Sequence, residues 1–143
     1  MPPASNLSRW LLPVIALLVG NSGITIVWVA VAILSGRPCG WLALVAAAEV
    51  VLLLRLTQAP AGYVRAVVAV FACALAIAVT LWMIAATQMG FVFRLGPIES
   101  ALKLGPVLAW ELTRLTLRPL DWMFIALSLP LAAWWGRGAR TDR

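Results

Sequence analysis

Two stretches of the chain are long, apolar and free of charged side chains. They cover residues 11–34 and 66–92 and consist mainly of Leu, Val, Ile and Ala. A helix needs about 20 predominantly apolar residues to cross the hydrocarbon core of a bilayer. We therefore predict membrane spans over residues 11–34 and 63–92.

Two shorter apolar stretches, residues 40–57 and 119–136, complete a prediction of four spans. The first carries Glu49 near its middle and Arg55 near its end, and we expect Arg55 to reach the membrane surface along its aliphatic stem. The second contains Pro130, which removes one backbone hydrogen bond and predicts a kinked or tilted helix.

The segment between the third and fourth spans, residues 97–118, has the pattern of an amphipathic helix. At about 100° per residue, its charged side chains fall within about one third of the helical wheel, and Leu102, Leu108, Leu112 and Leu115 lie away from that face. We predict an interfacial helix that is bent at Gly105 and Pro106, with a tryptophan near the lipid headgroups. An ordinary packed loop helix is the alternative. The predicted polar face consists of Glu99, Lys103, Glu111, Arg114 and Arg118, and the tryptophan is Trp110.

The composition agrees with this pattern. Of 143 residues, 64% are hydrophobic and 11% are charged, whereas an ordinary soluble domain is about half apolar and about a quarter charged. Little sequence remains for a soluble domain once the four spans and the interfacial helix are assigned. We predict an all-α integral membrane protein that forms a single transmembrane domain over residues 1–143.

The net charge of +6 predicts orientation rather than nucleic-acid binding, because most of the Arg residues border the apolar stretches. Basic residues are divided almost evenly between the two predicted sides. The C-terminal tail and the loop between the second and third spans are nevertheless compact basic clusters. We therefore predict that both termini are cytoplasmic, in a bacterial inner membrane.

A few polar residues fall at mid-membrane depth in the predicted spans. Asn21 and Ser22 lie near the middle of the first span, and Glu49 lies near the middle of the second. An intramembrane carboxylate is costly and is by default a functional candidate. We predict a small polar layer of these three residues, which serves either interhelical hydrogen bonding or, in a transporter, proton or cation binding.

Small residues recur four positions apart and allow helices to approach closely, either within the chain or against another protein. These pairs are Ala43 with Ala47, Ala72 with Ala76, and Ala86 with Gly90. Trp82 lies inside the third span, where its indole N–H requires an acceptor from a neighbouring helix or a partner chain. Trp82 and Arg55 are therefore candidate contacts for a substrate or a partner.

The sequence offers little for catalysis. It has no His, five acidic residues spread along the chain, and two distant Cys residues, so it contains no evident catalytic set, metal site or cofactor site. We predict a non-catalytic accessory, assembly or regulatory subunit of a larger membrane complex. Its partners would be the lipid bilayer and another membrane protein or a second copy, but not nucleic acid. The alternatives are a small dimeric proton- or cation-coupled transporter that uses Glu49, and a membrane immunity-type protein.

Overall fold

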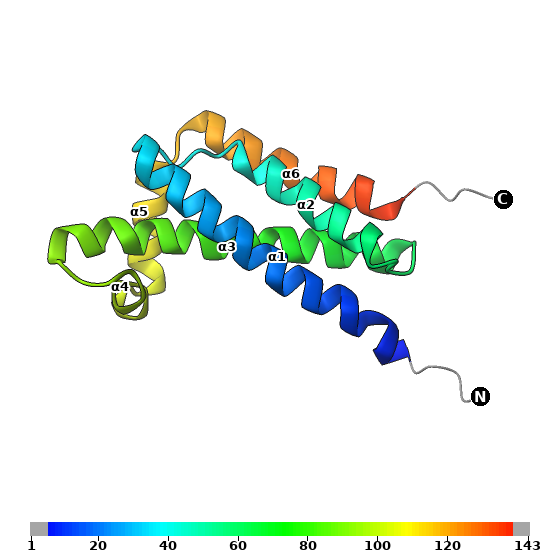
Figure 1. Ribbon diagram of the computed structural model, residues 1–143. Coiled ribbons are helices and arrows are strands. Elements are labelled where there is room, and N and C mark those ends of the chain that lie inside the picture. Colours follow the sequence, from blue (N-terminus) through cyan, green and yellow to red (C-terminus); the bar gives the residue numbers. More distant parts are fainter. Residues whose placement is uncertain (1–5, 139–143) are drawn as a thin grey trace.

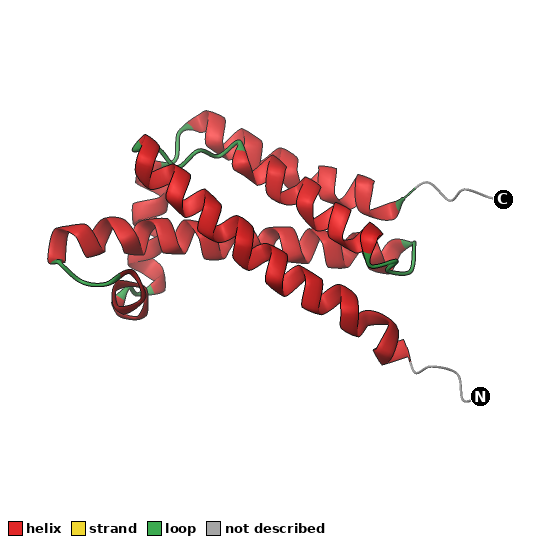
Figure 2. Cartoon of the chain, in the orientation of Figure 1, coloured by secondary structure: helices red, strands yellow, loops and turns green. Residues whose placement is uncertain are grey.

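The computed structural model describes residues 6–138, which form six helices joined by short loops and contain no strand (Figures 1 and 2). The prediction of an all-helical protein is confirmed for this part of the chain. The helices are α1 (Asn6–Ser35), α2 (Leu42–Leu56), α3 (Tyr63–Phe93), α4 (Pro97–Lys103), α5 (Pro106–Thr116) and α6 (Pro119–Arg137).

Helices α1, α2, α3 and α6 form a bundle in which α3 is central, because it contacts each of the other five helices. Helices α1 and α3 run in one direction, and α2 and α6 run in the opposite direction (Figure 1). We call the end where α1 begins and α6 ends the terminal end. Helices α4 and α5 lie at the opposite end, which we call the distal end (Figure 1).

Two helices are long and apolar enough to cross a membrane, namely α1, from Ser8 to Ser35, and α3. Helix α2 has 15 residues, or a length of about 22 Å at 1.5 Å per residue, and is too short for the same criterion. Helices α5 and α6 satisfy the criterion only as a pair, and they are bent by 112° at the break between them. The structure is thus a helical protein with two clear candidate membrane spans.

The predicted helix over residues 97–118 is divided into α4 and α5. Leu104 and Gly105, which separate them, have extended backbones with ψ angles of 112° and 153°. A proline disfavours the helical region for the residue before it, so Pro106 begins a new helix rather than bending an old one. The break lies at the predicted position, Gly105 and Pro106, but the prediction of one helix with a continuous polar face is wrong.

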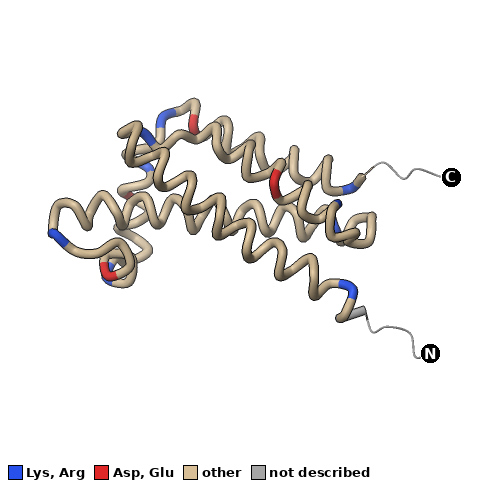
Figure 3. Tube along the Cα trace, in the orientation of Figure 1, with Lys and Arg blue, Asp and Glu red and all other residues tan. Residues whose placement is uncertain are grey.

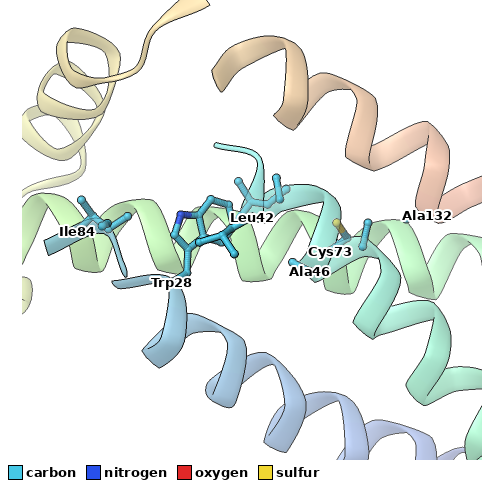
Figure 4. Packing of buried hydrophobic residues seen from close by; sticks show 10 residues of the cluster. Trp28, Leu42, Ala46, Cys73, Ile84 and Ala132 are labelled. Carbon is cyan, nitrogen blue, oxygen red and sulfur yellow. The ribbon is translucent and has the colours of Figure 1, made fainter. Parts of the chain in front are cut away.

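The largest fully buried side chain is Trp28 of α1, which sequence analysis did not identify. It packs in a core cluster with Leu42, Ala46 and Ile84, and Cys73 and Ala132 extend this cluster towards the terminal end (Figure 4). The indole nitrogen of Trp28 donates a hydrogen bond of 2.7 Å to the carbonyl of Pro38 in the α1–α2 loop. This tryptophan therefore both fills the core and fixes the loop.

The small residues noted in the sequence pack within the chain. All six are buried, namely Ala43, Ala47, Ala72, Ala76, Ala86 and Gly90. A Cβ atom at Gly90 would lie 2.8 Å from the carbonyl oxygen of Leu95 and 3.0 Å from Ser100 Oγ. These faces hold the bundle together and are not free to contact another protein.

At the distal end, α2 is held against the first turn of α6. The backbone N–H of Gly40 donates to Asp121 Oδ1 over 2.9 Å, and the N–H of Arg118 donates to Asp121 Oδ2 over 3.0 Å. A Cβ atom added to Gly40 would lie 2.6 Å from Asp121 Cα. Glycine at this position thus allows the backbones of two helix starts to approach closely.

We expect Gly40→Ala to destabilise the bundle by about 1–3 kcal/mol, because the new methyl group must displace the backbone of α6. The matched control is Gly23→Ala in α1, where a Cβ atom would meet nothing within 4 Å. Alanine is the better helix former, so this control should be neutral or slightly stabilising. Reversible unfolding in mixed detergent micelles measures both variants. Equal stability of the two would contradict the close packing at Gly40.

Candidate functional site

The candidate residues are distributed over several regions of the bundle. The first, which we call the polar junction, consists of Glu49 of α2 and Asn21 of α1. Glu49 faces α1 at Gly20, since a Cβ atom at Gly20 would lie 3.1 Å from Glu49 Oε1. The other carboxyl oxygen, Oε2, is buried and has no hydrogen-bond partner among the described residues. The same Cβ atom would clash first with Leu53 Cδ1, so the glycine in α1 makes room for Leu53 of α2 as well as for the carboxyl group of Glu49.

Asn21, which follows Gly20 in α1, bonds to α3. Its amide nitrogen donates a hydrogen bond of 3.1 Å to the backbone carbonyl of Ala72, while its Oδ1 atom is buried and has no partner among the described residues. The polar junction thus contains two buried acceptor oxygens without donors. A proton on Glu49 would supply one donor to this region.

Ser22 does not join the polar junction. It is exposed, and its hydroxyl donates to the carbonyl of Leu18 within the same helix over 2.7 Å. One turn beyond Asn21, the hydroxyl of Thr80 in α3 lies 3.1 Å from that of Thr25 in α1 and hydrogen-bonds to it. This interhelical pair was not predicted. The four-residue spacing of Asn21 and Thr25, which places both on one face of a helix, was the available signal.

At the terminal end, two arginines bind the last carbonyls of α6. Arg55 Nη2 donates to the carbonyl of Trp135 over 3.1 Å, and Arg65 Nε donates to that of Gly136 over 2.6 Å. The last carbonyls of a helix lack intrahelical donors and form the negative end of its dipole. Arg55, a predicted substrate or partner contact, and Arg65, which was not predicted, therefore share a structural role.

The second region is an apolar cavity of about 350 Å³ between α3, α5 and α6, which we call the tryptophan cavity. Trp82, Trp110 and Trp122 line it, and the last two rings meet edge to face at 5.9 Å between centroids. The indole nitrogen of Trp82 donates to the carbonyl of Ala101 in α4 over 3.1 Å. The expectation that Trp82 finds an acceptor on a neighbouring helix is confirmed.

Comparison with protein-family models, curated proteins and solved structures finds no match. The described residues contain no group of three or more His, Cys, Asp or Glu side chains that could hold a metal ion. Cys39 and Cys73 are both free, and Cys73 belongs to the apolar core.

The remaining predicted residues lie on the surface of the distal end. Lys103 Nζ and Glu99 Oε1 form an ion pair of 2.8 Å within α4, which is the only ion pair among the described residues. Glu111, Arg114 and Arg118 are exposed. Arg114 and Arg118 are not on one helix, because α5 ends at Thr116 and Arg118 precedes the first residue of α6. Both side chains are thus exposed on either side of the break between α5 and α6.

Proposed function

We propose that the chain crosses a membrane four times, as α1, α2, α3 and α6. The support comes from helix direction. Helices α1 and α3 are the two clear candidate spans, and they run the same way (Figure 1). A chain that crosses twice in one direction must return between the two crossings, and α2 is the only connection. Helix α6 likewise runs from the distal end to the terminal end. Its first turn is bonded to Gly40 at the distal end, and its last turn is bonded to Arg65 at the terminal end.

The short α2 is compatible with this arrangement. Its length of about 22 Å is less than the roughly 30 Å of a bilayer hydrocarbon core. A short span is accommodated by local thinning and by flanking residues that reach the interface. Trp41 precedes α2 and Arg55 lies in its last turn, and both are exposed. These are the residue types expected at the two membrane surfaces.

The proposed interfacial segment is α5. It crosses the distal end of the bundle at a steep angle to α3 (Figure 1). Lys and Arg lie mainly towards the two ends of the bundle, with long uncharged stretches between them (Figure 3). A membrane normal parallel to the bundle would place α5 in the plane of the surface, with its charged side chains near the headgroups. We place both termini in the cytoplasm of a bacterial cell.

Within this topology we propose the role of a non-catalytic accessory, assembly or regulatory subunit of a larger membrane complex. The observation that carries the proposal is that several polar side chains are used in bonds between elements of this chain. Trp28, Arg65, Thr80 and Asp121 each bond to another element of the same chain. The outward face of α1, in contrast, is apolar and has open space at Gly23. We propose this face as the contact with the larger subunit.

Photo-crosslinking in the source membrane tests the proposed contact. A photoreactive residue replaces Ile26 on the outward face of α1, and the control replaces Phe71 on α3, because these side chains are 70% and 69% exposed. We expect Ile26 to give one defined adduct with a larger protein and Phe71 to give none. Adducts with a second copy alone, or equal adducts at both positions, would contradict the subunit role.

The polar junction favours a transporter as the second candidate, because Glu49 Oε2 and Asn21 Oδ1 are buried without donors. The experiment is proton uptake into vesicles that contain the purified protein and a pH-sensitive dye. If the chain is a subunit, we expect no proton uptake, so that vesicles with the unaltered chain and vesicles with Glu49→Gln both give the dye signal of empty vesicles. We also expect Glu49→Gln to fold normally. Proton uptake by the unaltered chain that Glu49→Gln abolishes would instead support the transporter.

A further inference from the structure

We propose that the tryptophan cavity binds one acyl chain of an anionic phospholipid, whose phosphate is held by Arg114 and Arg118. This inference rests on the placement of α5 at the membrane surface proposed above. It assigns a ligand to a site that neither the subunit role nor the transporter role requires. Three features of the described residues support it, and they concern the lining of the cavity, two exposed arginines and the size of the cavity.

The lining is apolar. Besides the three tryptophans, it consists of aliphatic side chains, one proline and one threonine, contributed by α3, α5 and α6. Aromatic and aliphatic walls are typical of sites for apolar ligands. The N–H of Trp82 is already bonded to Ala101, so the cavity does not require a polar ligand there. A hydrocarbon chain is the ligand that matches such walls in a membrane.

Two exposed arginines lie close in sequence to lining residues on either side of the break between α5 and α6. Arg114 follows Thr113, which lines the cavity, and lies one helical turn after Trp110. Arg118 lies one turn before Trp122, directly before α6. Neither arginine forms an ion pair with another described residue, although Glu111 is three positions before Arg114. Guanidinium groups bind phosphate through paired hydrogen bonds. Two of them beside an apolar cavity match a phosphate with an acyl chain attached.

The size of the cavity distinguishes a lipid chain from other apolar occupants. Its volume of about 350 Å³ lies at the lower end of the range for small-ligand sites. A helix with its side chains is about 10–12 Å wide, so a helix of a second copy would not enter this space. The cavity extends from Pro106 and Trp122, near the break between α5 and α6, to Ala74 and Leu129, near the middle of α3 and α6. A lipid reaches this position directly from the bilayer.

Native mass spectrometry of the detergent-purified full chain tests the proposal. The probes are phosphatidylglycerol and phosphatidylcholine with identical acyl chains. We expect phosphatidylglycerol to be retained preferentially. Each arginine near an anionic lipid surface contributes about fivefold in affinity, so Arg114→Gln with Arg118→Gln should reduce retention strongly. The matched control is Arg37→Gln, which removes an exposed charge of the α1–α2 loop at the same end of the bundle but away from the lining residues, and it should reduce retention clearly less.

A second variant tests the cavity. Ala78→Phe introduces a ring from an exposed position of the lining and should lower retention of both lipids. An independent readout in the unaltered chain is quenching of tryptophan fluorescence by phosphatidylglycerol brominated on its acyl chains. We expect stronger quenching by this lipid than by brominated phosphatidylcholine. Equal retention of the two lipids, a preference that survives loss of both arginines, or equal quenching would overturn the proposal.

Discussion

Trp28→Ala is expected to lower the free energy of unfolding by about 3–5 kcal/mol, the largest effect of any substitution considered. The side chain is 0% exposed and is surrounded by residues of α2 and α3. Its removal leaves a cavity that these helices cannot fill, because α2 is held at Gly40 by its bond to Asp121. The carbonyl of Pro38 also loses its donor. Reversible unfolding in mixed detergent micelles measures the change.

Two controls separate the contributions of Trp28. Trp134→Ala removes the same side chain from a position that is 75% exposed, and it should change stability by less than about 0.5 kcal/mol. Trp28→Phe keeps most of the buried ring but removes the donor to Pro38, so we expect an intermediate loss of about 1–2 kcal/mol. A Trp28→Ala variant as stable as Trp134→Ala would contradict the described core.

Arg65→Met is expected to destabilise the terminal end by about 2–3 kcal/mol. The guanidinium group is buried and donates to the carbonyls of Gly136 and Ala59 over 2.6 Å and 3.4 Å. Hydrogen bonds from a charged donor contribute about 1.5–3 kcal/mol, and methionine leaves both carbonyls without this donor. Because Gly136 lies at the end of α6, hydrogen exchange should increase first at the last turn of this helix.

The matched control for Arg65 is Arg55→Met. Arg55 also donates to a carbonyl of α6, that of Trp135, but it is exposed. Exposed interactions of charged side chains contribute less than about 1 kcal/mol. We therefore expect Arg55→Met to be clearly milder than Arg65→Met. The reverse order would show that the contact with Gly136 does not hold α6 in place.

Helix positions were largely predictable from the sequence. The predicted spans over residues 11–34, 40–57, 63–92 and 119–136 each coincide with a helix to within a few residues at either end. The apolar segments are long and are bounded by Gly, Pro and charged residues, so the ends of each helix can be predicted closely. The need of Trp82 for an acceptor was also predictable, because a buried indole N–H requires a partner wherever the helices pack.

The sequence did not indicate which polar residues lie between helices. The sequence contains eight tryptophans, each with apolar neighbours along the chain. Trp28 is buried, and Trp134 is exposed, because of how the helices are rotated against one another, which the sequence does not show. The sequence indicated only that Arg65 is one of the basic residues near the loop between the second and third spans. Its bond to Gly136 depends on where α6 ends in space, which the sequence does not show. The separation of α4 from α5 did have a local signal in Pro106, whose effect on the preceding residues we underestimated.

The proposed topology depends most on α2, so cysteine accessibility across this helix is the most direct test. In a Cys39→Ser, Cys73→Ala background, Arg37→Cys places a thiol in the loop before α2, and Ala61→Cys places one in the loop after it. Both positions are exposed. We expect a membrane-impermeant maleimide to label Arg37→Cys in intact spheroplasts, and to label Ala61→Cys only after permeabilisation. Labelling of both thiols from the same side would contradict a crossing by α2 and with it the four-span topology.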